Sequence, residues 1–248
     1  MRTTSTLFGA FVASVTIPGT KAYFRLSCSI SQTSRIDPIL APVGLSAHVH
    51  KFSGASIRLR DLRKANCTTC EIQEDKSAYW TPQLYYQHGN RTFQEVPNEG
   101  MTVYYLGRGD NRMNIVLFPP SFRMITDDST CRSYDTGTRT FKADRPVGDR
   151  VTFACLGNAP SKEQNYMKET DCVNGLHAQL FFEVLYGVND IKKTGGKFTF
   201  ANGDTTGYSF HGDFMNGWNI DVLKAAIGDC LNADNGGAIS SCPSLAKS

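Results

Sequence analysis

The chain has 248 residues, of which 40% are hydrophobic and 20% charged, and a formal net charge of +3 at pH 7. This composition is that of a folded globular protein with a substantial core, and it excludes a largely disordered chain. The small net charge excludes a strongly basic nucleic-acid-binding tail, so a polyanion would have to meet a local cluster of basic side chains.

Residues 1–22 have the features of a secretory signal peptide. Arg2 precedes an apolar segment at residues 7–17, and small residues flank Lys21 near the expected cleavage site. We therefore expect a secreted, extracellular protein with one mature domain at residues 23–248, monomeric and not bound to a membrane. Loss of Arg2 and Lys21 lowers the charge from +3 to +1.

Eight cysteines follow the predicted signal segment, and in an exported protein they indicate disulfides. They are Cys28, Cys67, Cys70, Cys131, Cys155, Cys172, Cys230 and Cys242. Cys67 and Cys70 form the one CxxC sequence, which we interpret as structural rather than as a zinc or redox site. Because closing a long loop restricts the unfolded chain most, we expect at least two disulfides, one joining Cys67 or Cys70 to a distant cysteine.

Short segments rich in β-branched and aromatic residues, separated by Gly and Asn turns, predict a mainly β fold. The expected strands are residues 80–87, 101–107, 115–118, 151–156, 176–188 and 197–200. Strands at this spacing are typical of a sandwich or jelly-roll-like single domain.

Two helical segments are predicted, at residues 56–65 and at the C-terminal residues 219–231. The second begins with Asn219 as a polar N-cap, and we expect it to pack on the sheet. Its apolar side chains recur at helical spacing: Val222, Leu223, Ala226, Ile227 and Cys230.

Two short segments place chemically active side chains two residues apart: His48 with His50, and His211 with Asp213. In extended backbone both members of each pair project from one face. On neighbouring strands the four would converge on one cleft, where they could bind a divalent cation or divide into metal ligand, general base and transition-state stabiliser. The alternative is that each histidine is an ordinary surface or hydrogen-bonding residue, as we interpret His88 and His177.

A basic segment and several aromatic residues allow two interpretations each. Arg58 and Arg60, followed by Arg63 and Lys64, could hold a phosphate backbone or form the solvated face of a helix. Aromatic residues such as Tyr79 and Tyr86 could stack on sugars or bases, or fill the core.

Seven ordered motifs resemble those of a family of secreted fungal proteins, catalogued as a domain of unknown function and sometimes joined to WSC carbohydrate-binding modules. They are YFRLSC at 23–28, RIDPI at 35–39, HVH at 48–50, NCTTC at 66–70, DKSAYWTP at 75–82, FPPSFRM at 118–124 and FHGDFMNGW at 210–218. The resemblance covers nearly all of the mature chain.

The resemblance implies either a metal-dependent nuclease or a cell-wall protein. For a nuclease it implies His48, His50, His211 and Asp213 as catalytic residues, and Asp213, His211, Asp37 and Asn216 as metal ligands. We expect a divalent ion there, with Mg²⁺ or Mn²⁺ preferred to Zn²⁺.

One departure from the family concerns the junction of Phe182 and Glu183. Family members continue at this point into a block with two cysteines and a site histidine, which is absent here. The chain is then a short paralogue or the product of a gene-model error. In either case the departure implies an open wall of the cleft and a site that the deletion could inactivate.

Two functions therefore stay open. The first is a secreted, metal-dependent phosphodiester hydrolase, with Arg58, Arg60 and Tyr79 binding a nucleic acid substrate. The second is a non-catalytic extracellular protein that binds cell-wall polysaccharide through exposed tyrosines. The nearly neutral mature charge favours the second, and the histidine and carboxylate spacing favours the first.

Overall fold

The computed structural model describes residues 23–57, 62–106, 115–126, 129–133, 151–154, 166–167, 176–177, 179–231 and 237–245. The predicted signal segment lies outside these residues. The strands are β1 Tyr23–Ser34, β2 His50–Gly54, β3 Ala78–Pro82, β4 Leu84–Gln87, β5 Phe93–Glu95, β6 Asn98–Leu106, β7 Ile115–Val116, β8 Arg123–Thr126, β9 Val151–Ala154, β10 Tyr166–Met167, β11 Leu176–His177, β12 Gln179–Tyr186, β13 Lys197–Phe200 and β14 Asp213–Met215. The helical elements are α1 Ile220–Cys230 and the 3-10 turns η1 Leu62–Lys64, η6 Val188–Asp190 and η7 Ile239–Ser241.

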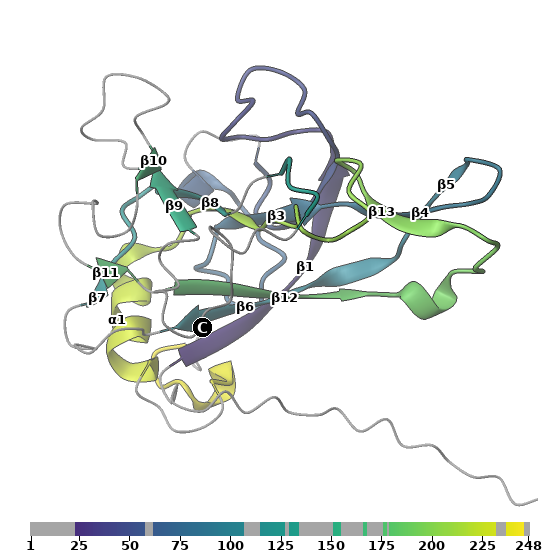
Figure 1. Ribbon diagram of the computed structural model, residues 1–248. Helices are drawn as coiled ribbons and strands as arrows, with labels where there is room; N and C mark the ends of the chain where they lie inside the picture. The colour runs from purple at the N-terminus through teal and green to yellow at the C-terminus, as the bar shows by residue number, and fades with distance from the viewer. Residues whose placement is uncertain are drawn as a thin grey trace, which may run out of the picture.

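A nine-stranded sheet in the order β10-β9-β8-β14-β3-β2-β1-β6-β12 dominates the fold (Figure 1). Strand β1 pairs with β6 along its first half and with β2 along its second, and the register shifts between Ile30 and Gln32. A smaller sheet has the order β13-β4-β5, and β11 and β7 form a parallel pair. The predicted mainly β, sandwich-like fold with a C-terminal helix is confirmed.

The main core lies between the large sheet and α1. Alternate side chains of β1, among them Phe24 and Leu26, are buried there. Asn219 caps α1 by accepting hydrogen bonds from two backbone amides, and the buried face of α1 is formed by Leu223, Ala226 and Cys230. The predicted helix at residues 219–231 and its apolar stripe are confirmed. No helix among the described residues is long and apolar enough to cross a membrane.

Several elements differ from the sequence-based prediction. Residues 80–87 form two strands with a break at Gln83, whose backbone amide donates to Val49 O and whose carbonyl accepts from Ala201 N. The described part of residues 56–65 contains only the turn η1, in which Leu62 is buried, instead of the predicted helix. Residues 58–61 of that segment, and therefore Arg58 and Arg60, lie outside the described residues.

A chain of buried hydrogen bonds crosses the main core. Trp218 Nε1 donates to the Tyr105 hydroxyl at 2.7 Å, which lies 2.7 Å from the Tyr79 hydroxyl. Tyr79 in turn donates to Asp75 at 2.7 Å, and the Ser77 amide donates to the same carboxyl. Tyr79 is fully buried. The prediction that it binds substrate is therefore wrong.

The second proposed stacking residue, Tyr86, is also buried, with 2% of its surface exposed. Alternation along a strand shows which residues share a face, but it does not show which face is covered. For both tyrosines the structure shows the second of the two alternatives, in which the ring fills the core.

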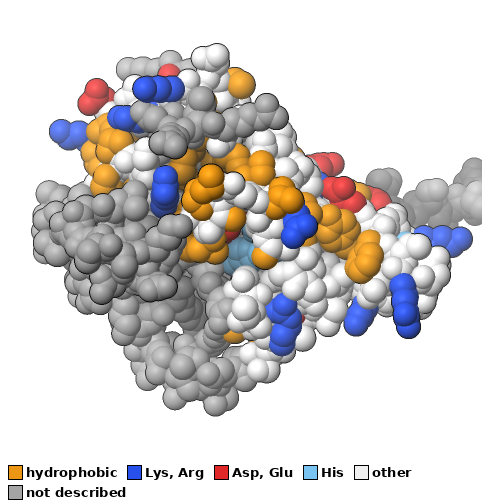
Figure 2. All heavy atoms as spheres, turned by 90° about the horizontal axis from the view of Figure 1, so that it is seen from above, with side chains coloured by type: hydrophobic (Ala, Val, Ile, Leu, Met, Phe, Trp, Pro, Cys, Tyr) orange, Lys and Arg blue, Asp and Glu red, His pale blue; other side chains and the backbone are white. Residues whose placement is uncertain are grey.

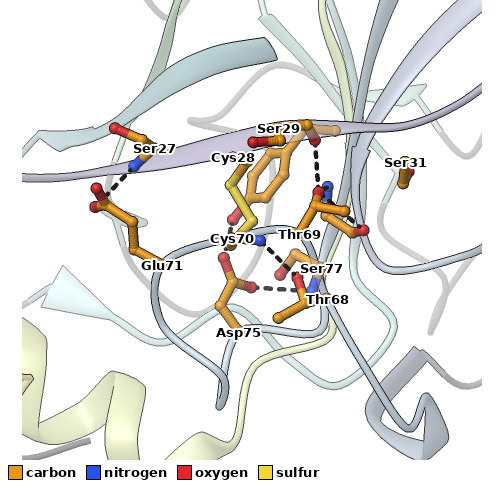
Figure 3. The surroundings of a disulfide bond; sticks show 12 residues. Ser27, Cys28, Ser29, Ser31, Thr68, Thr69, Cys70, Glu71, Asp75 and Ser77 are labelled. Carbon is orange, nitrogen blue, oxygen red and sulfur yellow. Dashed lines mark hydrogen bonds between the residues drawn. A yellow bond between two sulfur atoms is a disulfide. The ribbon is translucent and has the colours of Figure 1, made fainter. Parts of the chain in front are cut away.

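Two disulfides are described, Cys28–Cys70 and Cys230–Cys242. The first joins β1 to a loop 42 residues further along the chain, which confirms the expected long-range bridge (Figure 3). The thiols of Cys67 and Cys131 are free, and Cys155 and Cys172 lie outside the described residues.

We predict that the two bridges differ in their contribution to stability. Loop-closure entropy assigns about 4 kcal/mol to Cys28–Cys70 and about 3 kcal/mol to Cys230–Cys242, because the first closes the longer loop. Urea unfolding of the two double-alanine variants should reproduce this order. Cys67→Ala, which breaks no bridge, is the control, and an inverted order would contradict the prediction.

The buried Asp75 predicts a pH-dependent stability. Burial raises the pKa of its carboxyl from 3.8 to about 6, against the opposing hydrogen bonds of Ser77 and Tyr79. Between these values the folded state binds more protons than the unfolded state. The carboxyl's contribution to the free energy of unfolding is therefore complete below pH 4 and is lost as pH rises through 6.

We expect the loss to reach up to about 3 kcal/mol. Urea unfolding between pH 4 and 8 should show the wild-type protein losing free energy of unfolding relative to Asp75→Asn as pH rises. A difference between the two proteins that does not change with pH would contradict this.

Candidate metal centre

Three imidazoles converge from two segments of the chain. His48 lies in the loop before β2, His50 begins β2, and His211 lies two residues before β14. The Nε2 atom of His211 is 3.2 Å from that of His48 and 3.4 Å from that of His50. Figure 2 shows histidine side chains at the bottom of a hollow in the surface, bordered by hydrophobic side chains.

The sheet explains this convergence. Strand β3 pairs with β2 on one side and with β14 on the other, and Trp80 of β3 is the register partner of both Phe52 and Asp213. Phe52, Trp80 and Met215 pack in one apolar cluster, so they mark one face of the sheet. His50 and Asp213 each lie two residues from a member of this cluster and therefore on the same face.

Backbone carbonyls orient two of the rings. His50 Nδ1 donates to Ile36 O at 2.8 Å, and His211 Nδ1 donates to Ser209 O at 2.9 Å. Because a carbonyl oxygen only accepts, each Nδ1 carries the proton and each neutral ring presents an Nε2 lone pair to the centre. This is the usual arrangement of a metal-ligating histidine.

Two carboxyls adjoin the imidazoles. Asp37, His50 and Asp213 offer ligand atoms within 4.8 Å of one another, as do the three histidines. Oδ1 of Asp37 accepts hydrogen bonds from the Ile39 and Leu40 amides, and Oδ1 of Asp213 accepts one from Thr126 N at 3.2 Å. These bonds fix both side chains against the histidine cluster.

The electrostatics of the site favour a cation. Burial, reinforced by the neighbouring imidazoles, lowers the pKa of His48 to about 4, and burial likewise lowers that of His50 to about 4. Burial and the charge of Asp37 raise the pKa of Asp213 well above its usual range. Among the described residues no Lys or Arg forms an ion pair with Asp37 or Asp213. The site thus gathers imidazole lone pairs and carboxyls whose charged forms burial disfavours, and a bound cation would stabilise those charged forms.

The nitrogen spacing fits one small metal ion. Tetrahedral Zn²⁺ with Zn–N bonds of 2.0–2.1 Å requires ligand nitrogens roughly 3.3 Å apart, which matches the 3.2 Å and 3.4 Å observed. His50 Nε2 belongs to both ligand groups, and its Nδ1 is engaged by Ile36. Since one nitrogen lone pair binds one ion, the residues fit a mononuclear centre.

The turn at residues 204–209, which the sequence analysis did not single out, supports His211. The buried Asp204 accepts hydrogen bonds from the amide and hydroxyl of both Thr206 and Ser209, at 2.5–2.9 Å. Burial raises the pKa of Asp204, but these bonds outweigh it and hold the value at about 2. Asp204 thereby fixes Ser209, whose carbonyl orients His211. The Asp-x-Thr-x-x-Ser pattern was the available signal.

The structure does not bring Asn216 to the centre. Its amide nitrogen donates to Phe118 O and Pro119 O, and its Oδ1 accepts from Trp218 N. Asn216 is three residues from Asp213, so it lies on the opposite face of β14 and its extension. The prediction that Asn216 is a metal ligand is therefore wrong.

The junction at Phe182 is structurally continuous. Strand β12 passes through Phe182 and Glu183, which pair in register with Val103 and Thr102 of β6. Phe182 also packs against the backbone beside His211, where a Cβ on Gly212 would come within 2.7 Å of its ring. Strand β12, the edge strand of the large sheet, therefore runs through the junction without the additional block of the family.

Comparison with known proteins gives one family match, to the domain of unknown function DUF1996, over residues 37–183 and 177–218. The two matched segments overlap within β11 and β12. Together they contain all five residues of the centre: Asp37, His48, His50, His211 and Asp213. No curated protein matches the chain, and no solved structure matches it. With most of its length matched, the chain belongs to the DUF1996 family.

Proposed function

We propose that the chain is a secreted, metal-dependent hydrolase of phosphodiesters, with its metal held by His48, His50 and His211. The observation that carries the proposal is the approach of three oriented Nε2 atoms beside two buried carboxyls. Gathering imidazoles and carboxyls inside the fold is costly for folding. A functional role accounts for their assembly better than a structural one.

The donor set favours a transition metal. Imidazole nitrogen suits Zn²⁺ and its neighbours, whereas Mg²⁺ prefers carboxylate, carbonyl and water oxygens. Because three histidines offer nitrogen ligands, we propose Zn²⁺ in place of the Mg²⁺ or Mn²⁺ expected from the sequence. Asp213 or Asp37 completes the centre as an oxygen ligand or as a proton acceptor.

The residues can support hydrolysis in the following way. A divalent ion held by the histidines would polarise a phosphate oxygen and make a nearby water molecule more acidic. Asp37 and Asp213, which adjoin the histidines, would accept the proton that this water loses. The water oxygen bonds to phosphorus, one P–O ester bond breaks, and the leaving oxygen takes up a proton.

An anionic substrate is supported by the turn η1. Its buried Leu62 packs in the same apolar cluster as Ile36 and Ile39, which flank Asp37. Arg63 and Lys64 of this turn are exposed, so positive charge lies beside the loop that carries part of the centre. Secretion is supported by the disulfides, which persist in oxidising compartments.

Metal binding is the first test. We expect the apoprotein to bind one Zn²⁺ per chain in a titration against a competing chelator, and His211→Ala to weaken binding at least about 100-fold. His88→Ala is the matched control, because His88 contacts Thr194 and Gln94 outside the centre. Equal affinity in both variants would contradict the assigned ligands.

Hydrolysis is the second test, with plasmid DNA and bis(p-nitrophenyl) phosphate as substrates. Activity should disappear with chelator, return with Zn²⁺, and fall at least about 100-fold in Asp213→Asn with its melting temperature retained. A protein that binds Zn²⁺ but hydrolyses neither substrate would overturn the proposed reaction. The family member would then be an inactive form or a binding protein.

A further inference from the structure

A groove lies over the outer face of β1, β6 and β12, at residues that do not belong to the metal centre. It consists of two clefts of about 750 Å³ and 380 Å³ that share Ser27 and Thr102. These residues are opposite one another in the β1–β6 register. No residue of the metal centre lines either cleft.

An aromatic row borders this groove. Tyr23 of β1, Tyr104 of β6 and Phe181 of β12 follow one another across adjacent strands, with ring centroids 5.8 Å and 5.5 Å apart. Phe181 is 52% exposed. Arg25 lies over the Tyr104 ring, and the Tyr104 hydroxyl donates to Glu183 at 2.6 Å. Aromatic rings are thus held rigidly at the surface by polar neighbours.

The walls of the groove carry hydroxyls and carboxyls. Glu71 is held against β1 by the Cys28–Cys70 disulfide and by a 3.1 Å hydrogen bond from the Ser27 amide (Figure 3). Among the described residues that line the groove, the carboxyls are Glu71, Glu99, Glu183 and Asp190, and Arg25 is the one basic residue. Acidic groups therefore outnumber basic groups in the groove.

These features select a class of ligand. Pyranose rings present an apolar C–H face that packs on aromatic rings, and their hydroxyls donate to carboxylates. The excess of carboxyls disfavours acidic polymers. The ring planes are inclined by 46° and 64° to their neighbours, so the row cannot lie flat on a crystalline polymer surface.

We propose that this groove binds a single polysaccharide chain built from neutral or amine-bearing sugars. The proposal does not depend on the proposed hydrolase activity, since the two sites share no residue. A protein with both sites would be held at a glycan matrix through residues that its metal centre does not use.

The test is calorimetric titration of the full chain with laminarin oligosaccharides, chitosan oligosaccharides and polygalacturonate. We expect binding to laminarin or chitosan and not to polygalacturonate, and at least a tenfold loss in Phe181→Ala. Phe93→Ala is the matched control, because Phe93 is an exposed phenylalanine on β5 outside the groove.

Phe181→Ala should keep the melting temperature and the Zn²⁺ affinity of the wild-type protein. Glu183→Gln, which preserves shape, should also weaken binding. The proposal is overturned if no neutral or amine-bearing glycan binds, if polygalacturonate binds best, or if Phe181→Ala and Phe93→Ala bind equally. None of these outcomes bears on the metal centre, so the two proposals fail independently.

Discussion

The pairing of β3 with both β2 and β14 is the constraint on which the candidate centre depends. It brings together His48 and His211, which are 163 residues apart in the sequence. The buried ring of Trp80 stacks on Phe52 and fixes this part of the sheet. Because the backbone register determines which side chains meet, a one-residue slip of β14 would move Asp213 to the opposite face.

The surroundings of the centre keep it rigid at a cost in stability. Neutral imidazoles with their lone pairs facing one another repel, and burial disfavours the adjoining carboxylates. Hydrogen bonds to Ile36 and Ser209 hold the rings in place, and the Asp204 turn holds Ser209. Local strain of this kind persists where the surrounding fold over-determines the geometry, which is typical of a ligand site.

The sequence predicted the parts of the structure that depend on local pattern. The N-cap and apolar spacing were sufficient for α1, and the HxH and HxD spacings identified four of the five residues of the centre, the fifth being Asp37. The pattern could not show that Tyr79 and Asn216 face the core, since alternation leaves the covered face undetermined.

Other features depend on contacts between distant segments. Strand β1 is an exception: it was not among the expected strands, although Phe24, Leu26 and Cys28 alternate with polar residues in the local pattern of a half-buried strand. The Asp-x-Thr-x-x-Ser pattern signals the Asp204 turn, but it does not show that His211 beyond this turn meets His48 and His50 from a distant segment. The aromatic row likewise joins three strands that are far apart in the sequence.

The central claim is that the three histidines form one metal centre. X-ray absorption at the zinc edge of the Zn²⁺-loaded protein tests it most directly, because it reports the type and distance of the ligand atoms. The account predicts imidazole nitrogens at about 2.0–2.1 Å together with oxygen, and no sulfur. A spectrum dominated by sulfur from the free thiols of Cys67 or Cys131, or by oxygen alone, would contradict it.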